Sequence, residues 1–186
     1  LGGNNQIYAL TGDDIILTGS GDDIIYGGEG SDLATSGRGH DKFYGGNGDD
    51  LLNKHFGRVE FFGENGDDII MLAIDLTSPS FNYIIDGGDG IDTINLSTFS
   101  NQSFSMSEFI ALYTTIFSVE NINIYSYGDV YGSNLNESIY GESGSEILSG
   151  LSGDDRLYGN GGSDRLDGGD GDDWLYGGEE FFDTAY

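Results

Sequence analysis

Apolar residues recur along the chain at a fixed interval of nine residues, each at the centre of a short strand-like triplet. In the first array these central residues are Ile16, Ile25, Ala34, Phe43, Leu52, Phe61 and Ile70. In a second array they are Ile139, Leu148, Leu157, Leu166 and Leu175. Because successive side chains of a strand point to opposite faces, each triplet predicts a short strand with its central side chain directed inward.

Segments rich in glycine and aspartate, such as GGNGDD at residues 45–50, separate neighbouring triplets. Glycine permits positive φ and close backbone approach, so these segments predict tight turns. Two strand–turn units make one coil of 18 residues. Stacked coils place parallel strands about 4.8 Å apart, so the pattern predicts an all-β parallel roll.

The turns carry an acidic residue in the same nine-residue register. In the first array these residues are Asp14, Asp23, Asp32, Asp41, Asp50 and Asp68, and in the second they are Glu137, Glu146, Asp155, Asp164 and Asp173. Two residues earlier lie the glycines Gly12, Gly21, Gly30, Gly39, Gly48, Gly66, Gly153, Gly162 and Gly171. A further copy, GGDGIDTIN at residues 87–95, is out of phase with the first array and contributes Asp92.

Residues 18 apart lie directly above each other in stacked coils, so the acidic residues form ladders along the two edges of the roll. Asp32 is expected between Asp14 and Asp50, and Asp155 is expected to face Asp173. Carboxylates stacked this closely repel one another strongly when no cation lies between them. Calcium accepts six to eight oxygen ligands in a flexible arrangement, so the ladders predict several Ca²⁺ ions.

The nonapeptide GGxGxDxUx, where U is apolar, resembles the RTX calcium-binding repeat, and its copies cover most of the chain. The resemblance implies a right-handed parallel β-roll, or β-helix. It also implies that each ion takes the Asp carboxylate and backbone carbonyls from paired turns, so that the glycines act as carbonyl donors.

One copy departs from this pattern. In KHFGRVEFF, residues 54–62, Val59 stands where the other copies have Asp, while Gly57 and Phe61 keep their places. The coil is therefore expected to continue without its half of an ion site. Two interpretations remain open: this site has simply decayed, or Lys54 and Arg58 supply a fixed positive charge where the ion would lie.

A helix is predicted between the arrays, in FSMSEFIALYTTIF at residues 104–117. Ser105 and Glu108 form a capping box, and six apolar residues share one helical face. This face is expected to cover the outward ladder formed by Ile15, Leu33, Leu51 and Ile69; the alternative is that the helix caps the end of a coil. The predicted parts are 1–72 (first array), 73–128 (central insertion with one repeat and the helix) and 129–186 (second array).

Composition narrows the classes of partner. The chain has 33 acidic residues against 6 basic ones, a net charge of -27, which argues against nucleic acid or an anionic membrane. There is no cysteine, so disulfides and thiolate metal sites are excluded. No run of transmembrane length and no signal peptide is recognised, and the opening LGGNN suggests a piece of a longer protein.

The expected function is a calcium-binding module of a secreted bacterial protein that folds on meeting extracellular calcium. RTX resemblance implies export by type I secretion. One alternative is an adhesive module for polysaccharide or a cell surface, using Tyr140, Tyr158 and Tyr176 beside Trp174. The other is the non-catalytic part of an enzyme such as an epimerase, lipase or protease. The chain has only two histidines and no HExxH or GxSxG motif, so no catalysis is expected within it.

Overall fold

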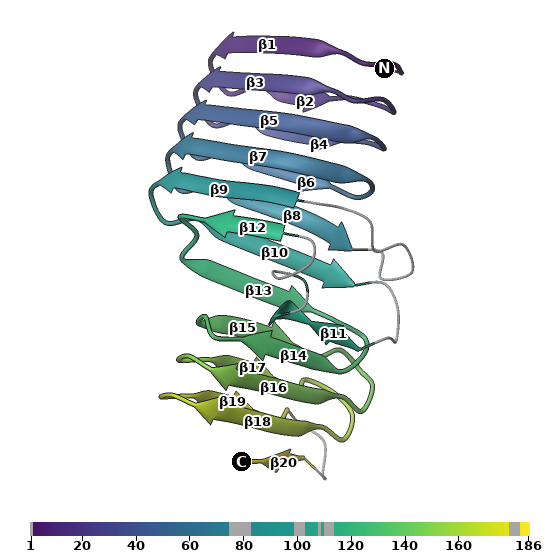
Figure 1. Cartoon of the computed structure of the whole chain (residues 1–186), viewed down its shortest axis with the longest axis vertical. Coiled ribbons are helices and arrows are strands. Elements are labelled where there is room, and N and C mark those ends of the chain that lie inside the picture. The colour runs from purple at the N-terminus through teal and green to yellow at the C-terminus, as the bar shows by residue number, and fades with distance from the viewer. Residues whose placement is uncertain (1, 75–82, 99–102, 108, 110–113, 179–182) are drawn as a thin grey trace. The chain divides into compact units, whose positions relative to one another are not determined.

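The computed structural model describes residues 2–74, 83–98, 103–107, 109, 114–178 and 183–186 (Figure 1). Strands dominate the described residues, and helical geometry is confined there to Met106, Ser107 and Phe109. The chain forms two compact units, which are described separately. The first contains Leu1–Ala73, Ser80–Asn95 and Leu112–Glu120, and the second contains Ile74–Pro79, Leu96–Ala111 and Asn121–Tyr186.

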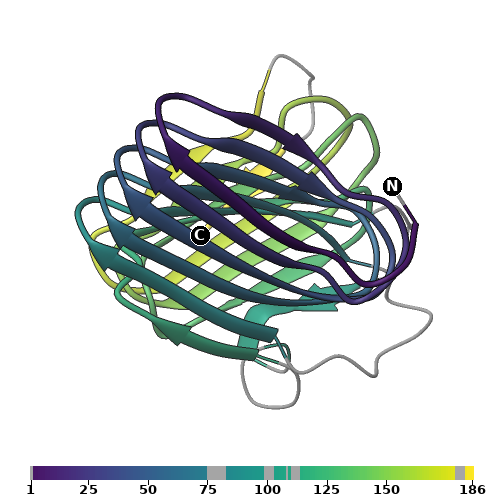
Figure 2. The same cartoon turned by 90° about the horizontal axis from the view of Figure 1, so that it is seen from above.

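The first unit is a roll of two parallel sheets. One sheet has the order β1 (Gln6–Thr11), β3 (Ile24–Glu29), β5 (His40–Asn47), β7 (Arg58–Asn65), β9 (Tyr83–Asp89) and β12 (Thr114–Phe117). The facing strands run β2 (Ile15–Leu17), β4 (Leu33–Ser36), β6 (Leu51–Lys54) and β8 (Ile69–Ile74). Strand β10 (Thr93–Thr98) follows β9 along the chain. Figure 2 shows successive turns of this unit stacked over one another.

The second unit repeats the arrangement. One sheet has the order β11 (Phe104–Ser105), β14 (Val130–Ser133), β16 (Ile147–Ser152), β18 (Arg165–Asp170) and β20 (Thr184–Ala185). The facing strands run β13 (Asn121–Tyr125), β15 (Glu137–Tyr140), β17 (Arg156–Tyr158) and β19 (Trp174–Tyr176).

The register confirms the predicted coil of 18 residues. Ile15 pairs with Leu33, Leu33 with Leu51, and Leu51 with Ile69, all in parallel. In the second unit Ile139 pairs with Leu157, and Leu157 with Leu175. The prediction of stacked parallel coils is therefore confirmed within each unit.

The predicted central residues form the cores of the two rolls. Those less than 2% exposed are Ile25, Ala34, Phe43, Leu52, Phe61, Ile70, Ile139, Leu148, Leu157 and Leu166. Leu175, in the last β17–β19 pair, is only half-buried. Removing these side chains from water is the main contribution to stability that the fold makes without any ion.

The predicted helix is wrong at its C-terminal end. Residues Thr114–Phe117 form strand β12 and pair with β9, while Phe104 and Ser105 form β11. Residues 108 and 110–113 of the prediction lie outside the described residues. Threonine and isoleucine favour strands because branching at Cβ fits a pleated surface, and pairing with β9 satisfies backbone groups as well as a helix would.

The predicted covering of the first array is also wrong. Ile15 is 75% exposed and Leu33 is 38% exposed. Met106 and Phe109 are instead buried, with the Phe109 ring 5.8 Å from that of Phe104. Ser107 Oγ donates a hydrogen bond of 3.0 Å to the Gly132 carbonyl. The helical residues therefore pack within the second unit next to β11, the first strand of its sheet, which favours the coil-end alternative.

Candidate metal sites in the turns

The glycines that precede each acidic residue by two positions shape the turns. Positive φ angles occur at Gly12, Gly21, Gly30, Gly39, Gly48, Gly66, Gly153, Gly162 and Gly171. At Gly30, where φ is 118°, a Cβ atom would lie 2.6 Å from the Gly12 carbonyl oxygen of the previous coil. Only glycine allows turns to stack at this distance. The structure thus places these glycines at the corners where successive turns meet.

One carboxylate oxygen of most ladder aspartates accepts a backbone N–H from the turn one coil earlier. Asp32 Oδ1 accepts the backbone N–H of Asp14 at 2.8 Å, and Asp50 Oδ1 accepts that of Asp32 at 2.7 Å. Asp68 Oδ1 accepts the N–H of Asp50 at 2.7 Å. The same bond, 2.8–2.9 Å long, recurs in four other pairs, in which the backbone N–H of the first residue donates to Oδ1 of the second: Asp23 and Asp41, Glu137 and Asp155, Glu146 and Asp164, and Asp155 and Asp173. The ladders predicted from the spacing are therefore brought together.

The second carboxylate oxygen is buried without a hydrogen-bond donor in most of these turns. Within the described part of the chain this applies to one oxygen each of Asp14, Asp23, Asp32, Asp50, Asp68, Asp92, Glu146, Asp155 and Asp164. A buried carboxylate oxygen that has lost water and gained no donor is costly. A row of such oxygens is the feature that a bound cation would satisfy.

Further glycines bring carbonyl groups close to these oxygens. A Cβ atom on Gly27 would lie 2.3 Å from Asp32 Oδ2 and 2.6 Å from the carbonyl oxygen of Gly45, in the next coil. Gly45 is placed in the same way between Asp50 Oδ2 and the Gly63 carbonyl. The sequence prediction did not single these glycines out, although the first residue of each GG pair marks them.

The donor set fits calcium rather than a softer metal. Within the described residues no three His, Cys, Asp or Glu side chains gather as a metal cluster. An ion held here would therefore combine a carboxylate with backbone carbonyls, which are the hard oxygen ligands that Ca²⁺ prefers. Ligands with this geometry recur in several turns, at Gly27, Gly45 and Gly63 in the first unit and at Gly141, Gly150 and Gly159 in the second, so the residues present fit several ions.

Burial changes the acidity of these carboxyl groups. It raises the pKa of Asp50 to about 6 and that of Asp68 to about 7. Burial likewise raises the pKa of Glu137 and Glu146 to about 7. The pKa values of Asp32, Asp92, Asp155 and Asp164 are also raised, again mainly by burial. Without a cation, the folded turns therefore hold protons more tightly than ordinary carboxylates do.

The ladders include Asp92, which was predicted as a site residue, and two further acidic residues that were not predicted. Asp92, out of phase in the sequence, joins the first ladder because its Oδ1 accepts the Asp68 N–H at 2.8 Å. Glu120 then accepts the Asp92 N–H at 2.8 Å. Asp183 accepts the Asp164 N–H at 2.9 Å. Sequence reasoning missed Glu120 and Asp183 because their separations from the previous acid are 28 and 19 residues rather than 18.

The exceptional turn contains a buried lysine. Lys54 is completely buried, and its Nζ contacts Asp41 Oδ2 and donates to the Gly37 carbonyl at 2.7 Å. Burial lowers the pKa of Lys54, and the contact with Asp41 opposes that change. Val59 is also fully buried. Arg58, the other residue proposed to supply charge, lies half-exposed with Nη2 3.9 Å from Glu60 Oε1.

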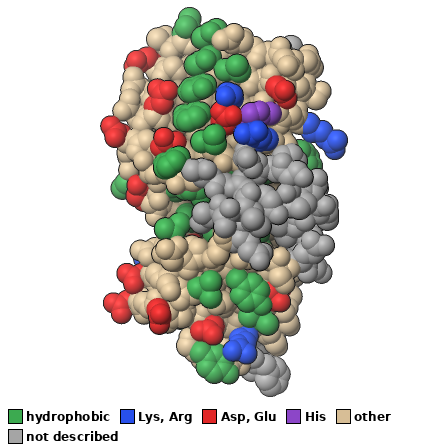
Figure 3. Space-filling model, viewed as in Figure 1, with side chains coloured by type: hydrophobic (Ala, Val, Ile, Leu, Met, Phe, Trp, Pro, Cys, Tyr) green, Lys and Arg blue, Asp and Glu red, His purple; other side chains and the backbone are tan. Residues whose placement is uncertain are grey.

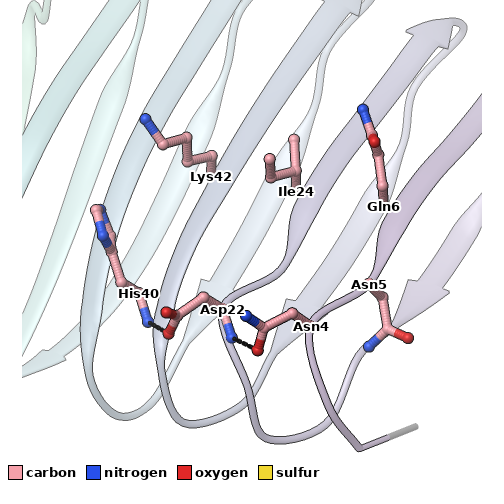
Figure 4. Close-up of a pocket in the computed structure, with 7 residues that line it drawn as sticks. All are labelled: Asn4, Asn5, Gln6, Asp22, Ile24, His40 and Lys42. Atoms are coloured by element: carbon pink, nitrogen blue, oxygen red, sulfur yellow. Dashed lines mark hydrogen bonds between the residues drawn. The ribbon is translucent and has the colours of Figure 1, made fainter.

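A shallow pocket lies beside the turns at the start of the first unit (Figure 4). It is lined by Asn4, Asn5, Gln6, Asp22, Ile24, His40 and Lys42. Among these residues, the backbone N–H of Asp22 donates to Asn4 Oδ1, and the backbone N–H of His40 donates to Asp22 Oδ1. His40 Nε2 lies 2.8 Å from Glu60 Oε1. Several of its polar side chains, such as Asn4, Asp22 and Lys42, thus already bond to a neighbouring coil.

Aromatic side chains form two outward ladders. Tyr8, Tyr26, Tyr44 and Phe62 stack with ring centroids 4.8–5.0 Å apart. Figure 3 shows a column of hydrophobic side chains on the surface of the first unit. In the second unit Tyr125, Tyr140 and Tyr158 stack at 4.8 Å. Such ring stacking along a sheet is typical of cross-strand packing.

Comparison with known protein families supports the interpretation of these turns as calcium-binding repeats. A model of the RTX calcium-binding nonapeptide repeat matches in four copies, at residues 1–34, 26–53, 131–165 and 149–180, which together exceed half of the chain. Curated proteins give no match. Among the described residues, no helix has the length and apolar character needed to span a membrane.

Proposed function

Because the chain belongs to the RTX calcium-binding nonapeptide repeat family, we propose that it is the calcium-triggered folding module of a secreted bacterial protein. The module folds on meeting extracellular calcium and supports type I secretion and the stability of its parent. The observation that carries the proposal is the row of buried carboxylate oxygens without a donor, most of which lie beside a glycine carbonyl, as in Asp32, Asp50 and Asp68.

Charge explains why calcium acts as the trigger. The chain carries a net charge of -27, and the fold stacks its acidic side chains one coil apart. Bound calcium supplies positive charge between the turns and links one coil to the next. Because a preformed site is absent from the unfolded chain, the free energy of ion binding becomes free energy of folding. Extracellular calcium modules require only affinities of about 10⁻⁴–10⁻³ M.

Counting bound ions tests this function directly. Native mass spectrometry in millimolar calcium should show several ions on each folded chain, and calorimetric titration should show binding coupled to folding. Magnesium provides the control, because it demands octahedral geometry and keeps its water. A chain that is folded and binds no calcium at millimolar concentration would rule the function out.

Binding to an extracellular polysaccharide or cell-surface component is the second candidate. Trp174 is 66% exposed and Tyr176 is 50% exposed, and Tyr176 continues the register of Tyr140 and Tyr158. Exposed aromatic faces of this kind can stack on sugar rings. Glycan-array binding in calcium, compared between the native chain and Trp174→Ala, distinguishes this function from a purely structural role.

A third candidate function is to support an enzyme of which this chain is a part. In that case the module is the non-catalytic part of an epimerase, lipase or protease. The sequence has neither an HExxH nor a GxSxG motif, which supports a non-catalytic role for this segment. Activity assays on the isolated segment with alginate, ester and peptide substrates should all be negative, and turnover of any of them would contradict the assignment.

A further inference from the structure

We propose that the Lys54 ammonium group takes the place of one calcium ion in the first unit. The turn at residues 36–41 is then held to the turn at residues 54–59 by a tethered cation, and this gap takes no Ca²⁺. The inference rests on the proposed function, in which the neighbouring gaps do take calcium.

The contacts of Lys54 are those expected of a bound cation. Its side chain is completely buried. Its Nζ contacts Asp41 Oδ2 and lies 2.7 Å from the Gly37 carbonyl oxygen and 3.4 Å from that of Gly39. All three partners are oxygens of one repeat turn in the coil before. They combine one carboxylate with backbone carbonyls, which is the donor combination found in the other turns.

The other turns show what Lys54 replaces. Asp32 and Asp50 each keep a buried oxygen without a donor, whereas Asp41 is absent from that set of orphaned oxygens because Lys54 reaches it. Lys54 stands at the first position of its nonapeptide, where the copies on the opposite edge have Gly45 and Gly63. A glycine leaves room there for an ion, while the lysine side chain fills that room.

Val59 is the second substitution that accompanies the replacement of the ion by Lys54. It occupies the aspartate position, pairs with Asp41 in the register and is fully buried. With Val59 in place, the gap holds one ammonium group and one carboxylate, so the charges balance. Decay of the aspartate alone would leave Asp41 buried and unpaired, which is costly. The two substitutions together keep the gap neutral, which favours replacement of the ion over decay of the site.

Lysine reactivity in the native protein provides the first test. The chain has two lysines, and the side chain of Lys42 is 36% exposed while that of Lys54 is not exposed. In saturating calcium, an amine-acetylating reagent should modify Lys42 and leave Lys54 unmodified, as read by peptide mass spectrometry. Equal modification of both lysines in the folded protein would show that calcium displaces Lys54 and would overturn the proposal.

Rebuilding the repeat provides the second test. The double variant Lys54→Gly with Val59→Asp restores the glycine and the aspartate of the other copies. Native mass spectrometry in calcium should count one more ion on this variant than on the native chain. Ser36→Gly is the matched control, because Ser36 occupies the same position one coil earlier and pairs with Lys54; its ion count should equal that of the native chain.

The outcomes separate this proposal from the proposed function. If the native chain binds no calcium, the proposed function fails, and the Lys54 proposal, which rests on it, fails with it. If the native chain binds calcium and the double variant binds the same number of ions, only the Lys54 proposal fails. Failure of the double variant to fold in calcium would also overturn it, because the gap would then be unable to accept the ion.

Discussion

At the scale of single residues, the two oxygens of most turn carboxylates have separate roles. In Asp32, Oδ1 accepts the backbone N–H of Asp14, while Oδ2 is buried without a donor. The first contact sets the register between coils and needs no ion. The second leaves a negative atom that a cation can satisfy. Replacing Asp32 by asparagine would preserve an acceptor for the first role and remove the charge required by the second.

Asp32→Ala should raise the calcium concentration at the folding midpoint more than Asp173→Ala does. Asp32 is 2% exposed and bonded on both sides, to Asp14 and through its own N–H to Asp50. Asp173 is only half-buried and accepts the Asp155 N–H near the end of its ladder. Calcium titration followed by circular dichroism gives both midpoints. Equal shifts would contradict the unequal roles of the middle and the end of a ladder.

Lowering the pH should weaken calcium binding. In the absence of calcium, lowering the pH should stabilise the folded chain. Asp68 and Glu146 have folded pKa values of about 7, against ordinary values of 3.8 and 4.5. At pH values between the ordinary pKa and the folded pKa, the folded state binds more protons than the unfolded state. The free energy of unfolding therefore rises as the pH falls from about 7 toward 4. Because calcium needs the deprotonated groups, its midpoint should be higher at pH 6 than at pH 8.

Two pH series check these signs. One follows the circular dichroism of the chain in chelator, where the β signal should increase on acidification. The other measures the calcium midpoint at each pH. A midpoint that stays constant between pH 8 and pH 6 would show that these carboxyl groups are not the ligands.

At the scale of elements, regular repeats were predictable and the interruption was not. Except at the last coil, where Leu175 is half-buried, the copies bury their central residue in the same way, as Leu52 and Leu157 do, so a local pattern was sufficient to predict the coils and the ladders. Asp92 was out of phase in the sequence, yet it continues the ladder from Asp68 across a separation of 24 residues. A periodic signal cannot reveal the spacing between two ladder residues where it departs from 18 residues.

The helix prediction failed for a different physical reason. The capping box and the apolar spacing were genuine local signals for residues 104–117, but pairing with a neighbouring strand overrode them at Thr114–Phe117. Secondary-structure propensity is a weak preference that tertiary contacts routinely reverse. Lys54 illustrates the same limit in a site: the sequence allowed either decay or fixed charge, and only its contacts with Asp41 and Gly37 distinguish them.

Phe109→Asp should destabilise the calcium-bound protein. Phe109 is 4% exposed, with its ring 5.8 Å from that of Phe104. Burial of a large apolar side chain contributes about 1.5–3 kcal/mol, and a buried unpaired carboxylate adds a further penalty. Thermal unfolding in saturating calcium should therefore show a clearly lower Tm. Phe117→Asp is the matched control, because Phe117 is 54% exposed; an equal loss in both variants would contradict the packing of Phe109.

At the scale of the whole molecule, the balance between burial and charge decides whether the chain folds. The apolar cores favour folding, but 33 acidic residues against 6 basic ones oppose it. Self-repulsion at such a net charge destabilises a compact state. Most of the ladder carboxylates also lose water without gaining a donor. Calcium removes both penalties at the same positions, so its effect on folding should be cooperative along each ladder.

In excess chelator at neutral pH the chain should be largely unfolded, and millimolar calcium should fold it in one cooperative transition. The reason is that folding without an ion buries carboxylate oxygens that have no donor and compacts a highly acidic chain, so ion binding and folding occur together. Magnesium should substitute poorly, since it holds its water and demands shorter, octahedral contacts. Far-ultraviolet circular dichroism during titration with each ion measures the transition, and sodium chloride at matched ionic strength controls for simple screening. Full β signal in chelator, or equal folding by salt alone, would show that repulsion between these carboxylates is not what keeps the chain unfolded.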